Sequence, residues 1–155
     1  MSKKWDDHFI ELAVKVSQMS KDPSTRVGAV VVGLDREILS TGFNGFPRGI
    51  EDTTERLNNR DLKLSLIVHA EMNAILQAAR NGVSTKGRKL YLAATDDSGK
   101  IWGGPPCTRC TVEIIQSGIS EIISRPYKGG FSRWENSLEV SSALLREAGI
   151  VYREV

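Results

Sequence analysis

Hydrophobic residues recur at helical spacing near the start of the chain and then give way to runs that are typical of strands. Between Trp5 and about Ser20, six apolar side chains fall on one face of a helix, which predicts an amphipathic helix packed along that face. The six are Trp5, Phe9, Leu12, Ala13, Val16 and Met19. Residues 27–32 and 37–42 then form two short runs rich in aliphatic and β-branched residues, separated by a turn, so we expect a hairpin.

The rest of the chain alternates helical and strand patterns. The predicted helices cover residues 69–81, 107–117 and 135–148, and the predicted strands cover residues 88–94, 120–124 and 150–152. Crossovers through helices make the later strand pairs parallel, although the pattern does not fix the direction of the last strand. The order predicts one domain over residues 1–155 with an α/β fold, a three-layer α/β/α sandwich around a mixed sheet of about five strands.

Two polar segments interrupt this order. Residues 51–65 are polar, with a possible helix start at Thr53, and their Asp, Glu and Arg side chains are expected on the surface. The apolar anchors of this segment are Leu57, Leu62 and Leu64. Residues 126–130 contain Pro and two Gly and predict a loop.

Composition is that of an ordinary globular protein. The chain has 155 residues, of which 40% are hydrophobic and 26% charged, and its net charge is +2. Its Lys and Arg residues are scattered and do not alternate with aromatics, which counts against tRNA or DNA as a partner. No apolar run reaches the length of a membrane span, and the polar N-terminal sequence lacks the hydrophobic block of a secretory signal. Two cysteines available for a metal suit a reducing compartment, so we expect a cytoplasmic location.

One histidine and both cysteines fall in two motifs that together suit a metal. A His-Ala-Glu motif at 69–71 opens one predicted helix, and a Pro-Cys-Thr-Arg-Cys motif at 106–110 opens another, where the helix dipole favours thiolate over thiol. Zinc held by one imidazole and two thiolates keeps a fourth position open for water. We therefore expect one Zn²⁺ per chain, bound by His69, Cys107 and Cys110, with Glu71 beside it to move protons.

Other interpretations of these residues require more metal ligands, or fewer, than the sequence offers. A lone Cys-x-x-Cys is also typical of a redox dithiol or of half a structural zinc site. A structural site requires four protein ligands, whereas Cys107 and Cys110 are the only cysteines and His8 is the only other histidine. His8 has no partner at metal-ligand spacing, so we interpret it as a surface residue.

A glycine-rich loop follows the predicted hairpin. Residues 42–49 contain three glycines, Asn44 and Arg48. This composition allows either a plain turn or a phosphate pocket built from backbone N–H groups and side-chain donors, and it does not separate the two.

Taken together, the motifs resemble those of the deoxycytidylate (dCMP) deaminases of the cytidine deaminase superfamily. The shared stretches are Lys-Asp-Pro at 21–23, Val-Gly-Ala at 27–29, Gly-Phe-Asn-Gly at 42–45, His-Ala-Glu-Met-Asn-Ala-Ile at 69–75 and the Cys-x-x-Cys motif. The zinc motifs belong to the whole superfamily, while Gly-Phe-Asn-Gly-x-Pro points to the dCMP branch. The resemblance implies a cytidine deaminase-like fold and hydrolysis of dCMP to dUMP and ammonia, which feeds thymidylate synthesis.

The resemblance also implies residues that bind the substrate. Asn44 and its neighbour Gly45 are expected to bind nucleotide. Backbone groups near Ala70 and Pro105 are expected to hydrogen-bond the pyrimidine edge. Tyr127 resembles the family tyrosine beside the nucleotide, although a tyrosine half-buried under a loop explains it nearly as well.

Assembly and regulation follow from the resemblance alone. The dCMP branch implies a homo-oligomer, a hexamer, that is activated by dCTP, with Mg²⁺ accompanying this effector, and inhibited by dTTP. The zinc chemistry by itself leaves open a deaminase of modified dCMP, cytidine, guanine or tRNA adenosine. It also leaves open a non-catalytic zinc-binding regulatory module, which would have no need of Glu71.

One segment departs from the family pattern. Members of the family run almost directly from the strand at 88–94 into Pro-Cys, whereas residues 95–104 intervene here. We expect this segment to act as a flap over the zinc pocket, with Gly99, Gly103 and Gly104 as pivots. Trp102 would then close over a base, or else pack at a subunit interface.

Overall fold

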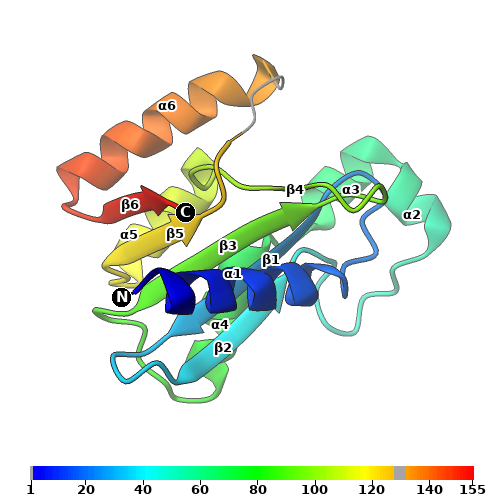
Figure 1. Ribbon diagram of the computed structural model, residues 1–155. Helices are drawn as coiled ribbons and strands as arrows, with labels where there is room; N and C mark the ends of the chain where they lie inside the picture. Colours follow the sequence, from blue (N-terminus) through cyan, green and yellow to red (C-terminus); the bar gives the residue numbers. More distant parts are fainter. Residues whose placement is uncertain (1, 128–131) are drawn as a thin grey trace.

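Six helices and six strands make up the computed structural model, which describes residues 2–127 and 132–155 (Figure 1). The helices are α1 (Lys3–Ser17), α2 (Thr54–Asn58), α3 (Arg60–Leu66), α4 (Ala70–Arg80), α5 (Thr108–Gln116) and α6 (Ser132–Glu147). The strands are β1 (Arg26–Val32), β2 (Ile38–Phe43), β3 (Lys89–Thr95), β4 (Ile101–Trp102), β5 (Glu121–Ser124) and β6 (Val151–Glu154). The loop predicted at 126–130 falls largely outside the described residues. In the described part of the chain, no helix is long and apolar enough to cross a membrane.

The strands form one mixed sheet in the order β2-β1-β3-β5-β6, and β4 pairs with β3 beside this path. β1 pairs antiparallel with both β2 and β3, so the predicted hairpin is confirmed. The β3–β5 and β5–β6 pairs are parallel, as predicted for strands joined through helices. The direction of β6, which the sequence left open, is therefore parallel to β5.

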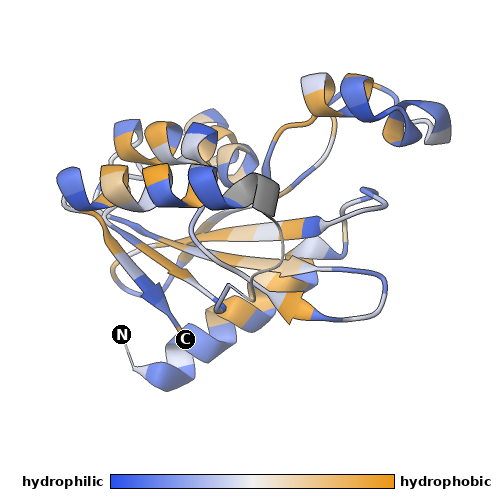
Figure 2. Ribbon diagram, turned by 90° about the horizontal axis from the view of Figure 1, so that it is seen from above, coloured by the Kyte–Doolittle hydropathy of each residue, from blue (hydrophilic) through white to orange (hydrophobic). Residues whose placement is uncertain are grey.

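Helices cover both faces of the sheet, which confirms the predicted three layers. Figure 2 shows α1 on the opposite side of the sheet from α4, α5 and α6. Under α1 lie side chains such as Val30 and Tyr91, while Val31 and Leu90 face the other three helices. Because successive strand residues point to opposite faces, a strand covered on both sides must be apolar at consecutive positions.

Two glycines let a helix approach each face of the sheet closely. A Cβ atom at Gly28 would lie 1.9 Å from the backbone oxygen of Ala13 in α1, and one at Gly42 would lie 2.3 Å from the backbone oxygen of Ala70 in α4. No side chain fits at such separations, so glycine sets the depth at which these helices pack. Gly42 thus serves helix packing at the start of the glycine-rich loop.

We expect Gly28→Ala to lower the free energy of unfolding by about 1–3 kcal/mol, because α1 must move away from β1 to admit a methyl group. Urea unfolding measures the change. Gly45→Ala is the matched control, since a Cβ atom there would meet only the Phe43 ring, at 3.7 Å. Equal unfolding midpoints for the two variants would show that the close approach of α1 tolerates a side chain.

The helix predicted from Trp5 to Ser20 is confirmed as α1, but it ends earlier. The N–H of Ser20 bonds back to the carbonyl oxygen of Ser17, and the Ser20 hydroxyl donates to the carbonyl oxygen of Asn44 at 2.7 Å. These bonds turn the chain away from the helix axis. Met19 is 65% exposed as a result, so the prediction that it packs inward is wrong. The buried residues of α1 are Asp6, Phe9, Ile10, Ala13 and Ser17.

The polar stretch at 51–65 forms two short helices, α2 and α3, which project from one end of the sheet (Figure 2). Thr53 caps α2, as its sequence predicts. Leu62 and Leu64 are exposed, so the prediction that they anchor the segment is wrong. The anchor is polar instead: the ammonium of Lys63 is buried and donates to Asp22 at 3.1 Å.

Residues 95–104 form a hairpin extension of β3. Trp102 pairs with Ala94 in an antiparallel ladder, and Gly99 turns the chain with a φ of 77°. Gly103 does not suit the predicted role of pivot, because a Cβ atom there would lie 2.2 Å from the backbone oxygen of Arg125. The backbone is held at this end, so any flap movement would involve the tip at 96–100.

A chain of charges, buried at Asp6 and partly exposed elsewhere, joins α1 to the last strand. Asp6 is 2% exposed and accepts hydrogen bonds from the Tyr91 hydroxyl at 2.7 Å and from Arg153 at 3.1 Å. Arg153 also donates to Glu121 at 2.7 Å, and Lys89 pairs with the same carboxylate. Burial opposes ionisation of Asp6, but the hydrogen bonds from Arg153 and Tyr91 outweigh it and hold its pKa below the ordinary value of 3.8. The network fastens β6 to the sheet and to α1.

We expect this network to make the fold sensitive to acid. Because the pKa of Asp6 is lower in the folded protein than in the unfolded chain, its contribution is present above about pH 4 and is lost as the pH falls through the folded value. Asp6→Asn should lower the free energy of unfolding at pH 7 by about 1–3 kcal/mol, because it removes the charge that accepts hydrogen bonds from Arg153 and Tyr91, and should flatten the dependence below pH 4. Urea unfolding between pH 3 and pH 7 tests this. Asp7→Asn, at a neighbouring surface ion pair with Lys3, is the control, and an equal loss in both variants would contradict the network's role.

Candidate metal centre and active site

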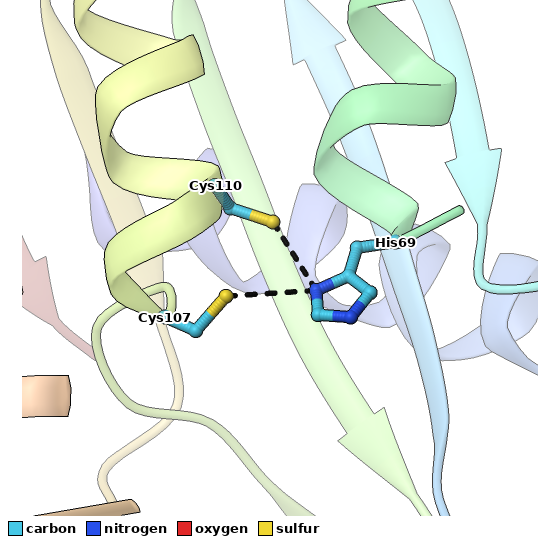
Figure 3. Close-up of side chains that lie close together, drawn as sticks. All are labelled: His69, Cys107 and Cys110. Atoms are coloured by element: carbon cyan, nitrogen blue, oxygen red, sulfur yellow. Dashed lines mark hydrogen bonds between the residues drawn. The ribbon is translucent and has the colours of Figure 1, made fainter. Parts of the chain in front are cut away.

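The three predicted zinc ligands lie together at the start of two adjacent helices. His69 occupies the N-cap position of α4, Cys107 occupies that of α5, and Cys110 lies in the first turn of α5. Nδ1 of His69 is 3.6 Å from Sγ of Cys107 and 3.2 Å from Sγ of Cys110 (Figure 3). Because α4 and α5 pack on the same face of the sheet, residues 38 positions apart in the sequence meet here.

The spacing of these donor atoms fits a zinc ion. Tetrahedral zinc, with bonds of about 2.0–2.1 Å to nitrogen and about 2.3 Å to sulfur, places a nitrogen and a sulfur roughly 3.6 Å apart. Both distances here are close to that value, and all three donor atoms lie within 4.8 Å of one another. Within the residues that the structure describes, no other cluster of three His, Cys, Asp or Glu side chains is close enough to hold a metal. His8 lies on the exposed surface, away from such a cluster.

Negative charge gathers around the imidazole. The hydrogen bond with Cys107 and the nearby Glu71 carboxylate raise the pKa of His69. The pKa of Cys107 is lowered to about 4, first by the hydrogen bond with Cys110 and further by the hydrogen bond with His69. A lowered thiol pKa beside a raised imidazole pKa describes a thiolate–imidazolium pair, and a zinc ion bound by both groups would take the place of the imidazole proton.

Glu71 lies in the first turn of α4, two residues after His69. It is only 7% exposed, and burial raises its pKa because an ionised carboxylate is disfavoured away from water. A raised pKa brings the carboxyl group closer to the range in which it can both accept and release a proton. A buried carboxyl group beside the metal ligands is therefore suited to proton transfer.

Asn44 is buried in the glycine-rich loop and braces it against β1. Its side-chain oxygen accepts a hydrogen bond from the N–H of Val27 at 2.7 Å, and its side-chain nitrogen donates to the carbonyl oxygen of Thr25 at 2.9 Å. Gly45 forms a two-way backbone bridge with Val68, just before the metal ligand His69. The loop is thus attached directly to the chain that enters the metal centre.

A hollow of about 220 Å³ opens beside this loop. Gly45 and Gly49 line it together with the cations Lys21 and Arg48 and two carboxylates, those of Asp22 and Asp52. Sequence reasoning did not assign Lys21 to this place, because its position in a loop before β1 carries no spacing signal. Lys21 pairs with Asp52 at 3.0 Å, so Arg48 is the cation that suits a phosphate group beside the exposed loop backbone.

The other three predicted substrate residues lie at two places. Ala70 is fully buried at the first position of α4. Pro105 and Tyr127 line a second hollow, of about 440 Å³, between the loop before Cys107 and the α6–β6 unit. The Tyr127 hydroxyl is buried and has no hydrogen-bond partner among the described residues.

A hydrogen-bonded path holds the loop that leads into Cys107. The N–H of Gly104 donates to the Ser124 hydroxyl at 3.2 Å. The same hydroxyl lies 2.9 Å from the hydroxyl of Tyr152 in β6. Sequence reasoning missed these partners, because isolated Ser and Tyr residues in short strands have no motif. The path ties the Pro105 region to the last strand.

Comparison with known proteins connects this site to a family. Residues 3–125 match the family described as the cytidine and deoxycytidylate deaminase zinc-binding region. The chain is 34% identical to the deoxycytidylate deaminase of Mus musculus, and the aligned part covers 97% of this chain and 79% of the mouse protein. A protein of Aliivibrio fischeri described as an uncharacterized deaminase is 36% identical, with 97% and 92% covered. The crystal structure of the dCMP deaminase of cyanophage S-TIM5 with dCMP and dUMP has the same fold, with a TM-score of 0.75 at 24% identity over 100% of this chain and 99% of that one.

Proposed function

Because the chain belongs to the cytidine and deoxycytidylate deaminase family, we propose that it catalyses the zinc-dependent hydrolytic deamination of dCMP to dUMP and ammonia. The observation that carries this proposal is the cluster of His69, Cys107 and Cys110 with the buried Glu71 beside it. Similarity to mammalian deoxycytidylate deaminases over 97% of the chain supports dCMP as the substrate. The product, dUMP, would feed thymidylate synthesis.

In this mechanism Glu71 carries protons in both directions. His69, Cys107 and Cys110 would hold zinc, which when bound would supply a water molecule of lowered pKa. Glu71 accepts a proton from water as the water oxygen bonds to C4 of the cytosine ring, and it passes this proton to N3. Glu71 then moves the remaining proton of the attacking oxygen to the amino nitrogen, the C4–N bond breaks, and ammonia leaves. The water oxygen stays on the ring as the carbonyl oxygen of uracil.

We assign substrate binding to two groups of residues. Asn44 and Gly45 would bind the nucleotide from the glycine-rich loop. This loop lies beside the metal centre, because Gly45 is bridged to Val68, the residue before His69. The backbone near Ala70 and Pro105 would hydrogen-bond the pyrimidine edge. Tyr127 would contact the nucleotide, and its buried hydroxyl without a partner among the described residues supports this role.

Regulation and assembly follow the same family pattern in our proposal. The chain would act as one deaminase domain over residues 1–155, assemble into a hexamer in the cytoplasm, and respond to dCTP with Mg²⁺ as activator and to dTTP as inhibitor. The hollow lined by Lys21 and Arg48 supports a nucleotide at the glycine-rich loop, because exposed Arg48 lies there beside the loop backbone, while Lys21 is paired with Asp52. Hyperbolic kinetics that neither triphosphate changes would contradict the regulatory part.

Ammonia release from the purified, zinc-loaded protein tests the reaction. The panel contains dCMP, 5-substituted dCMP, dCTP, deoxycytidine, cytidine, guanine and a tRNA. We expect dCMP to give the highest kcat/KM. A higher value for another compound would reassign the substrate, and no ammonia from any of them would indicate a non-catalytic zinc-binding module.

A further inference from the structure

The helix that carries both cysteines has no capping side chain of its own. An N-cap position is usually filled by Ser, Thr, Asp or Asn, whose oxygen accepts hydrogen bonds from free N–H groups of the first turn. In α5 this position is held by Cys107, which makes no side-chain capping bond and turns its sulfur toward His69 at 3.6 Å. Because the Cys107 side chain faces the metal site, the free N–H groups at the start of α5 need hydrogen-bond acceptors from another part of the chain.

α6 supplies the missing cap. The backbone N–H of Thr108, the first residue of α5, donates to the hydroxyl of Ser137 at 3.0 Å. The Thr108 hydroxyl donates to the carbonyl oxygen of Ser137 at 2.9 Å, and the two hydroxyl oxygens lie 3.0 Å apart. Because the Thr108 hydroxyl proton is used by the carbonyl, the Ser137 hydroxyl is the donor between the two oxygens. Thr108 is thus held to α6 through both its backbone and its side chain.

A second contact, one helical turn further along, reaches the backbone of a metal ligand. The hydroxyls of Ser141 and Thr111 are 2.6 Å apart, and both residues are fully buried. Thr111 donates from its hydroxyl to the carbonyl oxygen of Cys107 at 3.0 Å, and its N–H donates to the same oxygen at 2.9 Å. Since Thr111 uses its hydroxyl proton on Cys107, Ser141 donates to Thr111. Away from water such bonds are strong and directional.

We propose that Ser137 and Ser141 are positioning residues that fix the rotation of α5 about its axis and thereby set the affinity for zinc. Two contacts one turn apart fix a rotation, which a single contact would not do. Rotation of α5 would move both sulfurs relative to His69, because Cys107 and Cys110 stand on the same helix end. The inference rests on the proposed zinc ligands. It adds α6, which lies beyond the matched residues 3–125, to the metal centre.

The test is the zinc dissociation constant, measured by competition with a chelator. We expect Ser137→Ala and Ser141→Ala each to weaken binding and the double variant to weaken it by about 10- to 100-fold, the usual effect of removing groups that orient metal ligands. Ser142→Ala is the matched control, because its hydroxyl donates only to the carbonyl oxygen of Leu138 within α6, at 2.8 Å. We expect Ser142→Ala to bind zinc as the wild type does. Ser137→Thr keeps the hydroxyl and should restore affinity.

Thermal unfolding of the zinc-free and zinc-loaded forms separates positioning from plain stability. If the serines set the metal geometry, the rise in Tm on zinc binding becomes smaller in the variants. A rise equal to that of the wild type, or an unchanged dissociation constant in the double variant, would overturn the proposal. Should the double variant fail to fold, the single variants and Ser137→Thr decide the question. A wild type that binds zinc but releases no ammonia from dCMP would instead refute the proposed reaction, which is a separate result.

Discussion

Glu71→Gln should keep zinc and the fold but lower turnover by a factor of at least about 10² to 10⁴. An amide has nearly the shape of the carboxylate, and it can still form hydrogen bonds, but it cannot accept a proton from water and return it to N3 and the leaving nitrogen. The effect should therefore appear in kcat, measured as ammonia release at saturating dCMP. Metal analysis of the same sample should still give one zinc per chain.

Glu113→Gln provides the matched control for this experiment. Glu113 is a carboxylate on α5 that pairs with the exposed Arg109, outside the proton path assigned to Glu71. Its variant should turn over dCMP at nearly the wild-type rate. Near-normal turnover in Glu71→Gln itself would refute the mechanism, because no other described carboxylate occupies the first turn of α4.

Cys110→Ser should remove both zinc and activity. Cys110 is 1% exposed, so a buried hydroxyl, which does not ionise near neutral pH, takes the place of a thiolate. We expect zinc to fall from one ion per chain to almost none after dialysis against a chelator, and turnover to fall below detection. Elemental analysis and ammonia release measure the two effects.

The histidine outside the centre is the control for ligand identity. His8 is exposed and packs edge-on against Trp5 and Phe9, so His8→Gln should leave one zinc per chain in place. Two tightly bound zinc ions per chain in the wild type, or loss of zinc in His8→Gln, would contradict the assigned ligand set.

Local signals predict much of this fold. The hairpin of β1 and β2 follows from two runs of strand-forming residues around a turn, and α4 follows from apolar spacing that ends at Gly82, whose φ is 69°. The zinc ligands could be predicted for a similar reason. Cys107 and Cys110 are only three residues apart, and zinc in proteins is bound mainly by Cys, His and carboxylate side chains. Because the chain has only two cysteines and two histidines, few combinations of ligands are available.

Contacts between distant parts of the chain could not be predicted in the same way. Lys63 and Asp22 are 41 residues apart and Thr108 and Ser137 are 29 apart, and neither pair has a sequence signature. Met19 was misplaced because bonds from Ser20, one of them to the distant Asn44, end α1 early. The role of Asn44 itself illustrates the limit, since its amide binds the backbone of Thr25 and Val27, which composition alone does not reveal.

The ion pair between Asp6 and Arg153 has a consequence for how the chain is completed during synthesis. Its two members are 147 residues apart, so the carboxylate is made long before the guanidinium that it binds. At about 5–20 residues per second, a ribosome needs about 7 to 30 seconds to span that interval. Over that time α1 can cover the sheet only with Asp6 facing a gap where β6 will lie. The nascent chain therefore should gain its full resistance to proteolysis only after residues 151–154 have been made, when β6 pairs with β5 and completes the charge network.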